Sequence, residues 1–338
     1  GSHATAALSS TAFHTASLPD YALDSTATPA PPVLLLKIAQ NDRQGYIDQT
    51  GKIVIPPTFD WAGDFSEGLA VIRTGGINGN EGYIDQTGKV VIQPTYDEAT
   101  DFSGGLAAVY TRGPHRKAGY IDKTGRVVID LIYDDADGFQ EGLGRVAVND
   151  KYGFVDPTGK VVIAPTYDRA NDFSERLAKV DIGNKSGYID TTGTMVIQPV
   201  YSSAFDFHEG LAFVDDGTTR GFIDKTGKQV IAVAKTGSYG YFSEGLAWVW
   251  IGKKHGYIDT TGTLVIDTIY DDTHNFTEGL AAVKTGGKWG YIDKTGQMVI
   301  KPQYDKAFPF VNGFASVEVG DKDGYIDKTG TYIWQPSA

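Results

Sequence analysis

Short apolar segments recur along this chain at a nearly constant interval, and polar turns separate them. The tetrapeptide Gly-(Tyr/Phe)-(Ile/Val)-Asp occurs nine times, with 34 to 37 residues from one copy to the next. The copies begin at Gly45, Gly82, Gly119, Gly153, Gly187, Gly221, Gly256, Gly290 and Gly324. Such self-similarity indicates a tandem repeat in which each copy is one supersecondary unit.

The pattern within each copy predicts three strands. An Asp-x-Thr-Gly turn follows the first strand, and Asp at its first position with Gly at its fourth suits a type I turn that closes a hairpin. The apolar strand 89–93 then ends at Pro94, and its consecutive β-branched residues predict burial on both faces. The spacing of Ala99 and Phe102 suits one helical turn packed on the core, before a third strand over 105–109.

A single three-stranded meander cannot bury two apolar faces, whereas about nine stacked copies of about 34 residues can. The atypical end segments 33–38 and 331–336 would shield the ends of an open array. A closed propeller usually has four to eight blades of four strands, which fits these units poorly. The sequence therefore predicts an all-β fold of β-meander repeats stacked as an open, superhelical β-solenoid, with a closed β-propeller-like ring as the alternative.

Composition narrows the possible partners. The formal charge is −12 and the chain has no basic cluster, so we expect no nucleic-acid partner. The absence of cysteine excludes disulfides and a cysteine nucleophile. No apolar run is long enough for a transmembrane segment.

The two ends of the chain differ in composition. Residues 1–3 resemble an expression-vector scar, and residues 4–32 form a lead-in or linker rich in Ala, Ser, Thr and Pro. Residues 33–338 form the repeat domain. The lead-in suggests that a signal peptide once preceded it, so we expect an extracytoplasmic location, secreted or in the cell envelope.

The consensus Gly-Tyr-Ile-Asp-x-Thr-Gly-Lys-x-Val-Ile-x-Pro-x-Tyr-Asp-x-Ala-x-x-Phe-Ser-Glu-Gly-Leu-Ala resembles the WG-repeat (KWG repeat) family of bacterial proteins. The resemblance covers residues 33–336, although the Trp-Gly dipeptide occurs only at Trp289-Gly290. It implies a bacterial repeat module of the kind found in cell-envelope or multi-domain proteins. The family has no agreed catalytic residues, so the resemblance assigns none here.

Motifs for catalysis and metal binding are absent from the sequence. It has no zinc-protease motif, nucleophile elbow, P-loop or EF-hand spacing. We therefore expect no catalytic residue, no metal site and no cofactor. The Asp-Asp pairs 134–135, 215–216 and 271–272 are interpreted as solvated loop residues rather than as ligands of a divalent ion.

One unit departs from the pattern and carries the candidate site. Segment 228–242 lacks the Pro-x-Tyr-Asp sequence, and two alternating tryptophans and a histidine follow it. Departures from a consistent pattern concentrate at functional sites, and aromatic rings suit sugar rings or peptide anchors. The predicted ligand-binding residues are Tyr239, Tyr241, Trp248, Trp250, His255 and Trp289. Drift in one repeat, with the aromatic rings filling the core, is the alternative interpretation.

The residue before each repeat glycine forms a second candidate surface. It differs in all nine copies, which indicates an exposed position that either contacts a ligand or is unconstrained. The sequence as a whole favours a non-catalytic binding or structural scaffold that recognises cell-wall or other polysaccharide, or a protein partner. A carbohydrate-active hydrolase with a site near 228–256 is the alternative, and a passive spacer is a third possibility.

Overall fold

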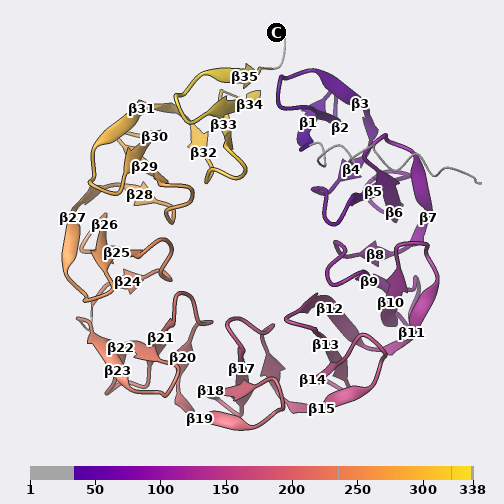
Figure 1. Ribbon diagram of the computed structural model, residues 1–338, viewed down its shortest axis with the longest axis horizontal. Coiled ribbons are helices and arrows are strands. Elements are labelled where there is room, and N and C mark those ends of the chain that lie inside the picture. Colours follow the sequence, from indigo (N-terminus) through magenta and orange to yellow (C-terminus); the bar gives the residue numbers. More distant parts are fainter. Residues whose placement is uncertain (1–33, 235, 321, 336–338) are drawn as a thin grey trace, which may run out of the picture. The chain divides into compact units, whose positions relative to one another are not determined.

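The computed structural model describes residues 34–234, 236–320 and 322–335. The predicted vector scar and lead-in lie outside the described residues. The described part of the chain forms 35 strands in nine antiparallel sheets that surround a central opening (Figure 1). The all-β prediction is confirmed, and the described residues contain no helix that could span a membrane.

We call the sheets blades 1 to 9 in chain order. Blade 1 has the strands β1 (Leu36–Gln40), β2 (Arg43–Ile47) and β3 (Ile53–Phe59). Blades 2 and 3 comprise β4 (Trp61–Ala62), β5 (Leu69–Thr74), β6 (Asn80–Asp85), β7 (Val90–Tyr96), β8 (Glu98–Ala99), β9 (Leu106–Tyr110), β10 (Ala118–Asp122) and β11 (Val127–Tyr133). Blades 4 and 5 comprise β12 (Asp135–Gln140), β13 (Leu143–Val148), β14 (Lys151–Val155), β15 (Val161–Tyr167), β16 (Arg169–Ala170), β17 (Leu177–Ile182), β18 (Lys185–Asp190) and β19 (Met195–Tyr201).

The remaining four blades repeat the same plan. Blades 6 and 7 comprise β20 (Ser203–Ala204), β21 (Leu211–Asp215), β22 (Arg220–Asp224), β23 (Gln229–Ala232), β24 (Ser238–Tyr239), β25 (Leu246–Ile251), β26 (Lys254–Asp259) and β27 (Leu264–Tyr270). Blades 8 and 9 comprise β28 (Asp272–Thr273), β29 (Leu280–Thr285), β30 (Lys288–Asp293), β31 (Met298–Tyr304), β32 (Lys306–Ala307), β33 (Phe314–Val319), β34 (Lys322–Asp327) and β35 (Tyr332–Trp334).

A sequence repeat and a blade are out of phase. The copy that begins at Gly82 supplies β6 and β7 to blade 2 and then β8 and β9 to blade 3. The helical turn predicted for the connection is wrong, because Ala99 belongs to β8 and pairs with Val109 of β9. Phe102, which follows β8, is buried in the core as predicted. Each repeat therefore ties two neighbouring blades together.

The predicted open solenoid is wrong, because the blades close into a nine-bladed β-propeller. Blade 9 packs on blade 1, where the Tyr325 hydroxyl donates to the carbonyl of Lys37 at 2.9 Å and Trp334 clusters with Ile38 and Ile47. The three-stranded interpretation missed the inner strand of blades 2 to 9, which has two residues in every one of these blades except blade 4. With that strand each blade is narrow near the opening and wide at the periphery, so successive sheets fan around an axis (Figure 1).

The hydrophobic core lies between the blades. The described residues form nine clusters of buried apolar side chains, and each cluster is shared by two adjacent blades. We call each such contact a seam and name it by its blades. In seam 2/3 the rings of Tyr83 and Phe102 lie 4.8 Å apart, and the Tyr83 hydroxyl donates to the carbonyl of Thr100 at 2.8 Å. Seam 2/3 thus joins ring packing to a specific hydrogen bond.

The outer strands are buried on one side only. In β7, Ile92 is 7% exposed whereas Val91 is 39% exposed. The predicted burial of these strands on both faces is wrong, because no further sheet covers the periphery of the ring. Alternation along the strand then places successive side chains on opposite sides.

The Asp-x-Thr-Gly turns form as predicted. In the first copy, one carboxylate oxygen of Asp48 accepts hydrogen bonds from the Thr50 amide at 2.9 Å, the Thr50 hydroxyl at 2.6 Å and the Lys52 amide at 3.1 Å. Gly51 has a φ of 83°, which favours glycine. The Thr50 hydrogen bond outweighs desolvation and lowers the pKa of Asp48. These aspartates are therefore turn residues.

Candidate ligand-binding crevices

Two kinds of loop meet at one end of the ring. The connection from one blade to the next lies beside the loop between the second and third strands of the following blade. Asp60 of the first connection accepts hydrogen bonds from the amides of Gly75 at 2.8 Å and Gly76 at 2.9 Å, both in such a loop. We call this end the loop face. The loops here vary in length from copy to copy, so this face is the one on which the blades differ most.

Two hollows lie in seams at the loop face. Crevice 4/5 has a volume of about 510 Å³ and is lined by Asp134, Asp135, Arg145, Ala147, Asp150, Tyr152, Asp168, Arg169, Ala170 and Asn171. Crevice 6/7 has a volume of about 430 Å³ and is lined by Ser203, Phe205, Phe213, Asp215, Arg220, Ser238, Tyr239, Gly240, Tyr241 and Trp248. The two crevices occupy equivalent places in the ring but differ in chemistry.

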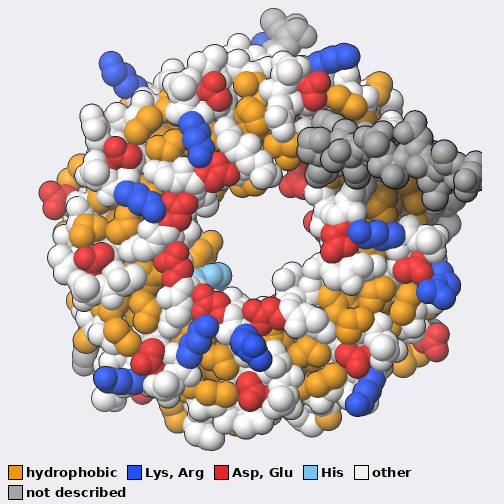
Figure 2. All heavy atoms as spheres, viewed as in Figure 1, with side chains coloured by type: hydrophobic (Ala, Val, Ile, Leu, Met, Phe, Trp, Pro, Cys, Tyr) orange, Lys and Arg blue, Asp and Glu red, His pale blue; other side chains and the backbone are white. Residues whose placement is uncertain are grey.

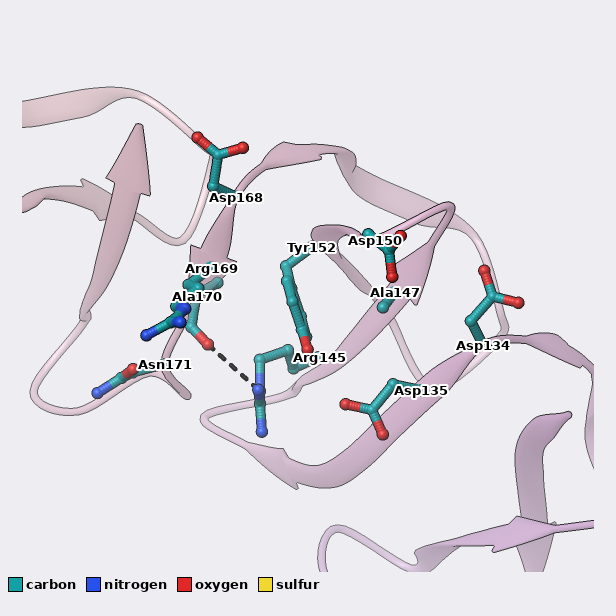
Figure 3. Close-up of a pocket in the computed structure, with 10 residues that line it drawn as sticks. All are labelled: Asp134, Asp135, Arg145, Ala147, Asp150, Tyr152, Asp168, Arg169, Ala170 and Asn171. Atoms are coloured by element: carbon teal, nitrogen blue, oxygen red, sulfur yellow. Dashed lines mark hydrogen bonds between the residues drawn. The ribbon is translucent and has the colours of Figure 1, made fainter. Parts of the chain in front are cut away.

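Crevice 4/5 is centred on an arginine and a tyrosine. Figure 3 shows Arg145 below the Tyr152 ring, with aspartates around them, and the guanidinium carbon lies 5.5 Å from the ring centre. Arg145 reaches across the seam, where its Nη1 donates to the carbonyl of Ala170 at 3.2 Å and its Nε donates to Asp172 at 3.0 Å. It also pairs with Asp137 of its own blade. The arginine is thus fully engaged in holding the seam together.

The carboxylates around crevice 4/5 are unequal. Burial raises the pKa of Asp172, and neighbouring Asp137 adds to the shift, against the lowering effect of Arg145. Hydrogen bonds from Lys117 and from Lys151 lower the pKa of Asp134 and of Asp168, respectively. Crevice 4/5 is therefore a charged site whose ionic groups mostly satisfy one another.

Crevice 6/7 is lined mainly by aromatic rings. Phe213 and Tyr239 are buried and stack with their ring centres 5.6 Å apart, whereas Phe205 is 48% exposed and Tyr241 is 44% exposed. Tyr241 also stacks on His208, with a centre-to-centre distance of 4.1 Å. The crevice therefore offers a buried aromatic floor and two exposed rings.

Arg220 covers this floor and is held from three sides. Its guanidinium carbon lies 5.6 Å from the Phe213 ring centre and 5.7 Å from that of Tyr239. Its Nη groups donate to the carbonyls of Ala234 and Gly237, each at 2.7 Å, and its Nε lies 2.9 Å from a carboxylate oxygen of Asp215. The charge of Arg220 is therefore neutralised within the crevice.

Gly240 makes room for Trp248. A Cβ atom on Gly240 would lie 2.2 Å from Nε1 of the Trp248 indole, a distance at which one of the two groups has to move. The indole therefore lies directly over the backbone of Gly240. Only a glycine at this position permits that contact.

The departure from the repeat explains why crevice 6/7 is open. The outer strand β23 has four residues where β19 and β27 have seven, since blade 6 lacks the Pro-x-Tyr-Asp segment. In the neighbouring blades 5 and 7 the tyrosine of that segment, Tyr201 or Tyr270, is buried. In blade 6 the segment that replaces it offers the carbonyls of Ala234 and Gly237 to Arg220.

The six predicted site residues fall into three seams. Tyr239, Tyr241 and Trp248 line crevice 6/7. Trp250 and His255 belong to seam 7/8, where His255 Nδ1 lies 3.4 Å from the hydroxyl of Thr273. Trp289 is buried in seam 8/9 and stacks on His274 at 4.9 Å. The structure therefore brings three of the predicted residues together in one hollow, and their role in binding stays a prediction.

The residue before each repeat glycine is not generally exposed, contrary to expectation. Glu81 is 2% exposed, and its carboxylate accepts the amide of Ala99 in the next blade at 2.7 Å. Gln44 makes the same contact to the amide of Ala62 at 2.6 Å. In these two copies the side chain therefore joins its blade to the next. Tyr152 and Arg220, which hold this position in blades 4 and 6, line the two crevices.

Sequence reasoning missed Phe205, Phe213 and Arg145, and it included Tyr152 and Arg220 only in the second candidate surface, as residues that precede a repeat glycine. A signal for two of them exists, because Arg145 and Phe213 stand at the third position of a Leu-(Ala/Gly)-x segment, where some other copies have small residues such as Ala108 and Ala282. A comparison of the copies position by position reveals both. Among the described residues, no group of three or more acidic or histidine side chains is placed to hold a metal ion.

Comparison with known proteins gives one family and one fold. The model of the family described as "WG containing repeat" matches residues 45–76, 82–113, 119–152, 152–185, 187–217, 221–254, 256–289 and 289–322. No curated protein matches the chain.

Solved structures resemble the chain at low identity. A crystal structure of a eukaryotic initiation factor is 11% identical, with 91% of this chain and 96% of that chain covered at a TM-score of 0.63. The AfRom2 CNH domain is 9% identical, with 70% of this chain and 92% of that chain covered at a TM-score of 0.35. The first likeness shows the fold alone. Eight matched repeats that extend over most of the described ring establish that the chain belongs to the WG containing repeat family.

Proposed function

We propose that the protein is a non-catalytic binding propeller that holds a sugar unit of a neutral polysaccharide in crevice 6/7. The observation that carries this proposal is the pair of exposed rings, Phe205 and Tyr241, beside the Trp248 indole in a hollow of about 430 Å³. The flat C–H face of a sugar packs on such rings, and a few polar groups then fix its orientation. Asp215, Ser203 and Ser238 supply those polar groups.

The charge distribution supports a neutral ligand. Arg220 and Asp215 form an ion pair in crevice 6/7, and the chain carries a formal charge of −12. Acidic side chains also lie on the rim of the central opening (Figure 2). An anionic glycan would be repelled by this field, whereas a neutral one would not.

Hydrolysis of a bound glycan would need two carboxyl groups flanking the scissile bond. Asp215 is the one carboxylate among the residues that line crevice 6/7, and it is paired with Arg220. The second carboxyl group would have to come from outside the lining. The single carboxylate favours binding over hydrolysis. Detection of shorter sugars cleaved from a bound oligosaccharide would favour hydrolysis instead.

The proposal is tested by calorimetric titration with neutral hexasaccharides of glucose, xylose and N-acetylglucosamine. Phe205 and Phe308 follow the inner strands of blades 6 and 9 at the same position and are 48% and 46% exposed, so they are a matched pair. We expect Phe205→Ala to weaken binding about tenfold, in line with the loss of a stacking anchor. Phe308→Ala should leave the affinity unchanged.

Equal effects of the two variants would contradict crevice 6/7 as the site. Binding of a protein partner through Phe205, without any affinity for the oligosaccharides, would instead replace the polysaccharide with the other expected class of partner.

A further inference from the structure

Most seams of the propeller contain a tyrosine hydroxyl that donates a hydrogen bond across the seam, and two seams lack it. In six seams a tyrosine hydroxyl donates a hydrogen bond to a backbone carbonyl of the next blade. The acceptor is the residue that directly follows the inner strand or, in blade 4, the equivalent residue within that strand. These contacts are 2.6 to 2.8 Å long and join Tyr46 to Gly63, Tyr83 to Thr100, Tyr120 to Asp137, Tyr188 to Phe205, Tyr257 to His274 and Tyr291 to Phe308. Tyr325 closes the ring in a related way on Lys37.

Seams 4/5 and 6/7 have phenylalanine at this position. The ring of Phe154 lies 4.8 Å from that of Phe173, and the ring of Phe222 lies 4.9 Å from that of Phe242. Tyrosine rings in other seams pack at the same distance, as Tyr83 shows at 4.8 Å from its partner. The ring is therefore retained in both seams, and the hydroxyl group is lost.

The lost hydroxyls lie at crevices 4/5 and 6/7. The carbonyls left without a tyrosine donor belong to Asn171 in seam 4/5 and Gly240 in seam 6/7, and both residues line their crevices. Within the described part of the chain, no group donates a hydrogen bond to the carbonyl of Gly240. A carbonyl that loses its donor in a partly desolvated place gains from any ligand that supplies one.

We propose that Phe222 determines the specificity of crevice 6/7, and that a ligand hydroxyl takes the place of the missing tyrosine hydroxyl at the Gly240 carbonyl. This inference rests on the proposed function and sharpens its ligand class. The ligand presents an apolar ring face to Phe205 and Tyr241 and a hydroxyl group to Gly240, a combination that a neutral hexose or pentose unit has. A tyrosine at 222 would satisfy the carbonyl from within the protein and remove the preference.

The experiment compares Phe222→Tyr with Phe154→Tyr, which makes the same chemical change in crevice 4/5. Each variant is titrated with the hexasaccharides named above and unfolded in guanidinium chloride. We expect both variants to unfold at a higher denaturant concentration than the parent protein, because each gains a hydrogen bond across its seam. Phe222→Tyr should weaken oligosaccharide binding at least tenfold, whereas Phe154→Tyr should leave it within twofold.

Phe222→Leu separates the hydroxyl from the ring. It loses the ring packing on Phe213 and Tyr239 without adding a donor, so its loss of affinity measures the packing contribution alone and should be smaller than that of Phe222→Tyr. Unchanged affinity in Phe222→Tyr, or a loss in Phe154→Tyr of equal size, overturns the inference while the proposed function stands. A parent protein that binds none of the hexasaccharides overturns both, and the denaturant midpoints then still report whether the hydroxyl bonds form.

Discussion

Crevices 4/5 and 6/7 are built on the same backbone frame and carry opposite chemistry. Arg145 and Phe213 occupy equivalent positions on the second strands of blades 4 and 6. Within its blade, Arg145 is paired with Phe154 on the third strand, and Phe213 is paired with Phe222. Asn171 and Gly240 also occupy equivalent positions, since the amide of each donates to the second strand of its own blade at 2.9 Å. The strands therefore fix where a crevice lies, and a few side chains decide what it can bind.

Each crevice places a guanidinium group over an aromatic ring, but from exchanged positions. In crevice 4/5 the arginine is on the second strand of its blade and Tyr152 is on the third, whereas in crevice 6/7 Phe213 is on the second and Arg220 on the third. Arg145 donates hydrogen bonds to Asp137 of its own blade and to Ala170 and Asp172 of the next blade, which leaves a charged and filled seam. Arg220 is neutralised by its own blade and the connection that follows, which leaves the rings of Phe205 and Tyr241 exposed.

The largest effect expected from this comparison is on stability in crevice 4/5. Arg145→Met removes the partner of Asp137 and of Asp172, which is partly buried. We expect unfolding free energy at pH 7 to fall by about 3 kcal/mol, the cost of leaving a desolvated charge unpaired. Denaturant titration of the variant and the parent measures the difference. A loss below about 0.5 kcal/mol would mean that Arg145 is a surface ion pair of little consequence.

Predictability from sequence follows from how local each feature is. The Asp-x-Thr-Gly turns were predictable because Asp48 and its counterparts bond within four residues along the chain. Ring closure was not, because it depends on a contact between Tyr325 and Lys37 and on inner strands that mostly have two residues and produce almost no pattern. Local signals thus specified the hairpins and gave no information on how the sheets close.

Some residues of crevice 6/7 could be predicted from the sequence and others could not, for a similar reason. Tyr239, Tyr241 and Trp248 attracted notice because segment 228–242 breaks the repeat register. Phe213 and Phe222 stand within well-formed repeats, and a phenylalanine in a strand is unremarkable by itself. Their meaning depends on what the other copies carry at the same position and on the carbonyl that faces them across the seam.

The next largest effect is expected from a substitution of Gly240 in crevice 6/7, which should lower both stability and binding. Gly240→Ala would place a Cβ atom 2.2 Å from Nε1 of Trp248, so the indole has to leave its place. We expect a loss of about 2 kcal/mol in unfolding free energy, typical of overpacking, together with loss of oligosaccharide binding. Gly138→Ala in blade 4 is the control, since its nearest neighbour would be the Ser103 Cβ at 3.8 Å. Equal behaviour of the two variants would show that Trp248 adapts freely.

A smaller effect is expected of pH on the loss of unfolding free energy that Arg145→Met causes. Burial raises the pKa of Asp172, and Arg145 opposes that rise, so removing the arginine raises the pKa further. A carboxyl group whose pKa is raised on folding stabilises the folded protein fully at a pH below its unfolded-state pKa of 3.8. That stabilisation is lost as the pH increases through the folded-state pKa. The deficit of Arg145→Met should therefore shrink by about 1 kcal/mol between pH 7 and pH 5, for a single partly screened carboxyl group.

Denaturant titrations at both pH values measure this change. The window stays above the range in which the turn aspartates, whose pKa values are lowered, begin to lose their contribution. A deficit that grows toward pH 5 would show that Asp172 is not the carboxyl group that Arg145 compensates.

The smallest expected effect decides how far the binding surface extends. Trp250 is 41% exposed, pairs with His255 and lies in seam 7/8 outside the lining of crevice 6/7, although sequence reasoning grouped it with Trp248. Trp250→Ala should change unfolding free energy by less than about 0.5 kcal/mol, as for an exposed surface position, and leave oligosaccharide affinity within twofold. If it instead weakens binding as much as Phe205→Ala does, the ligand passes from crevice 6/7 over blade 7. The predicted aromatic patch would then be one continuous site across two seams.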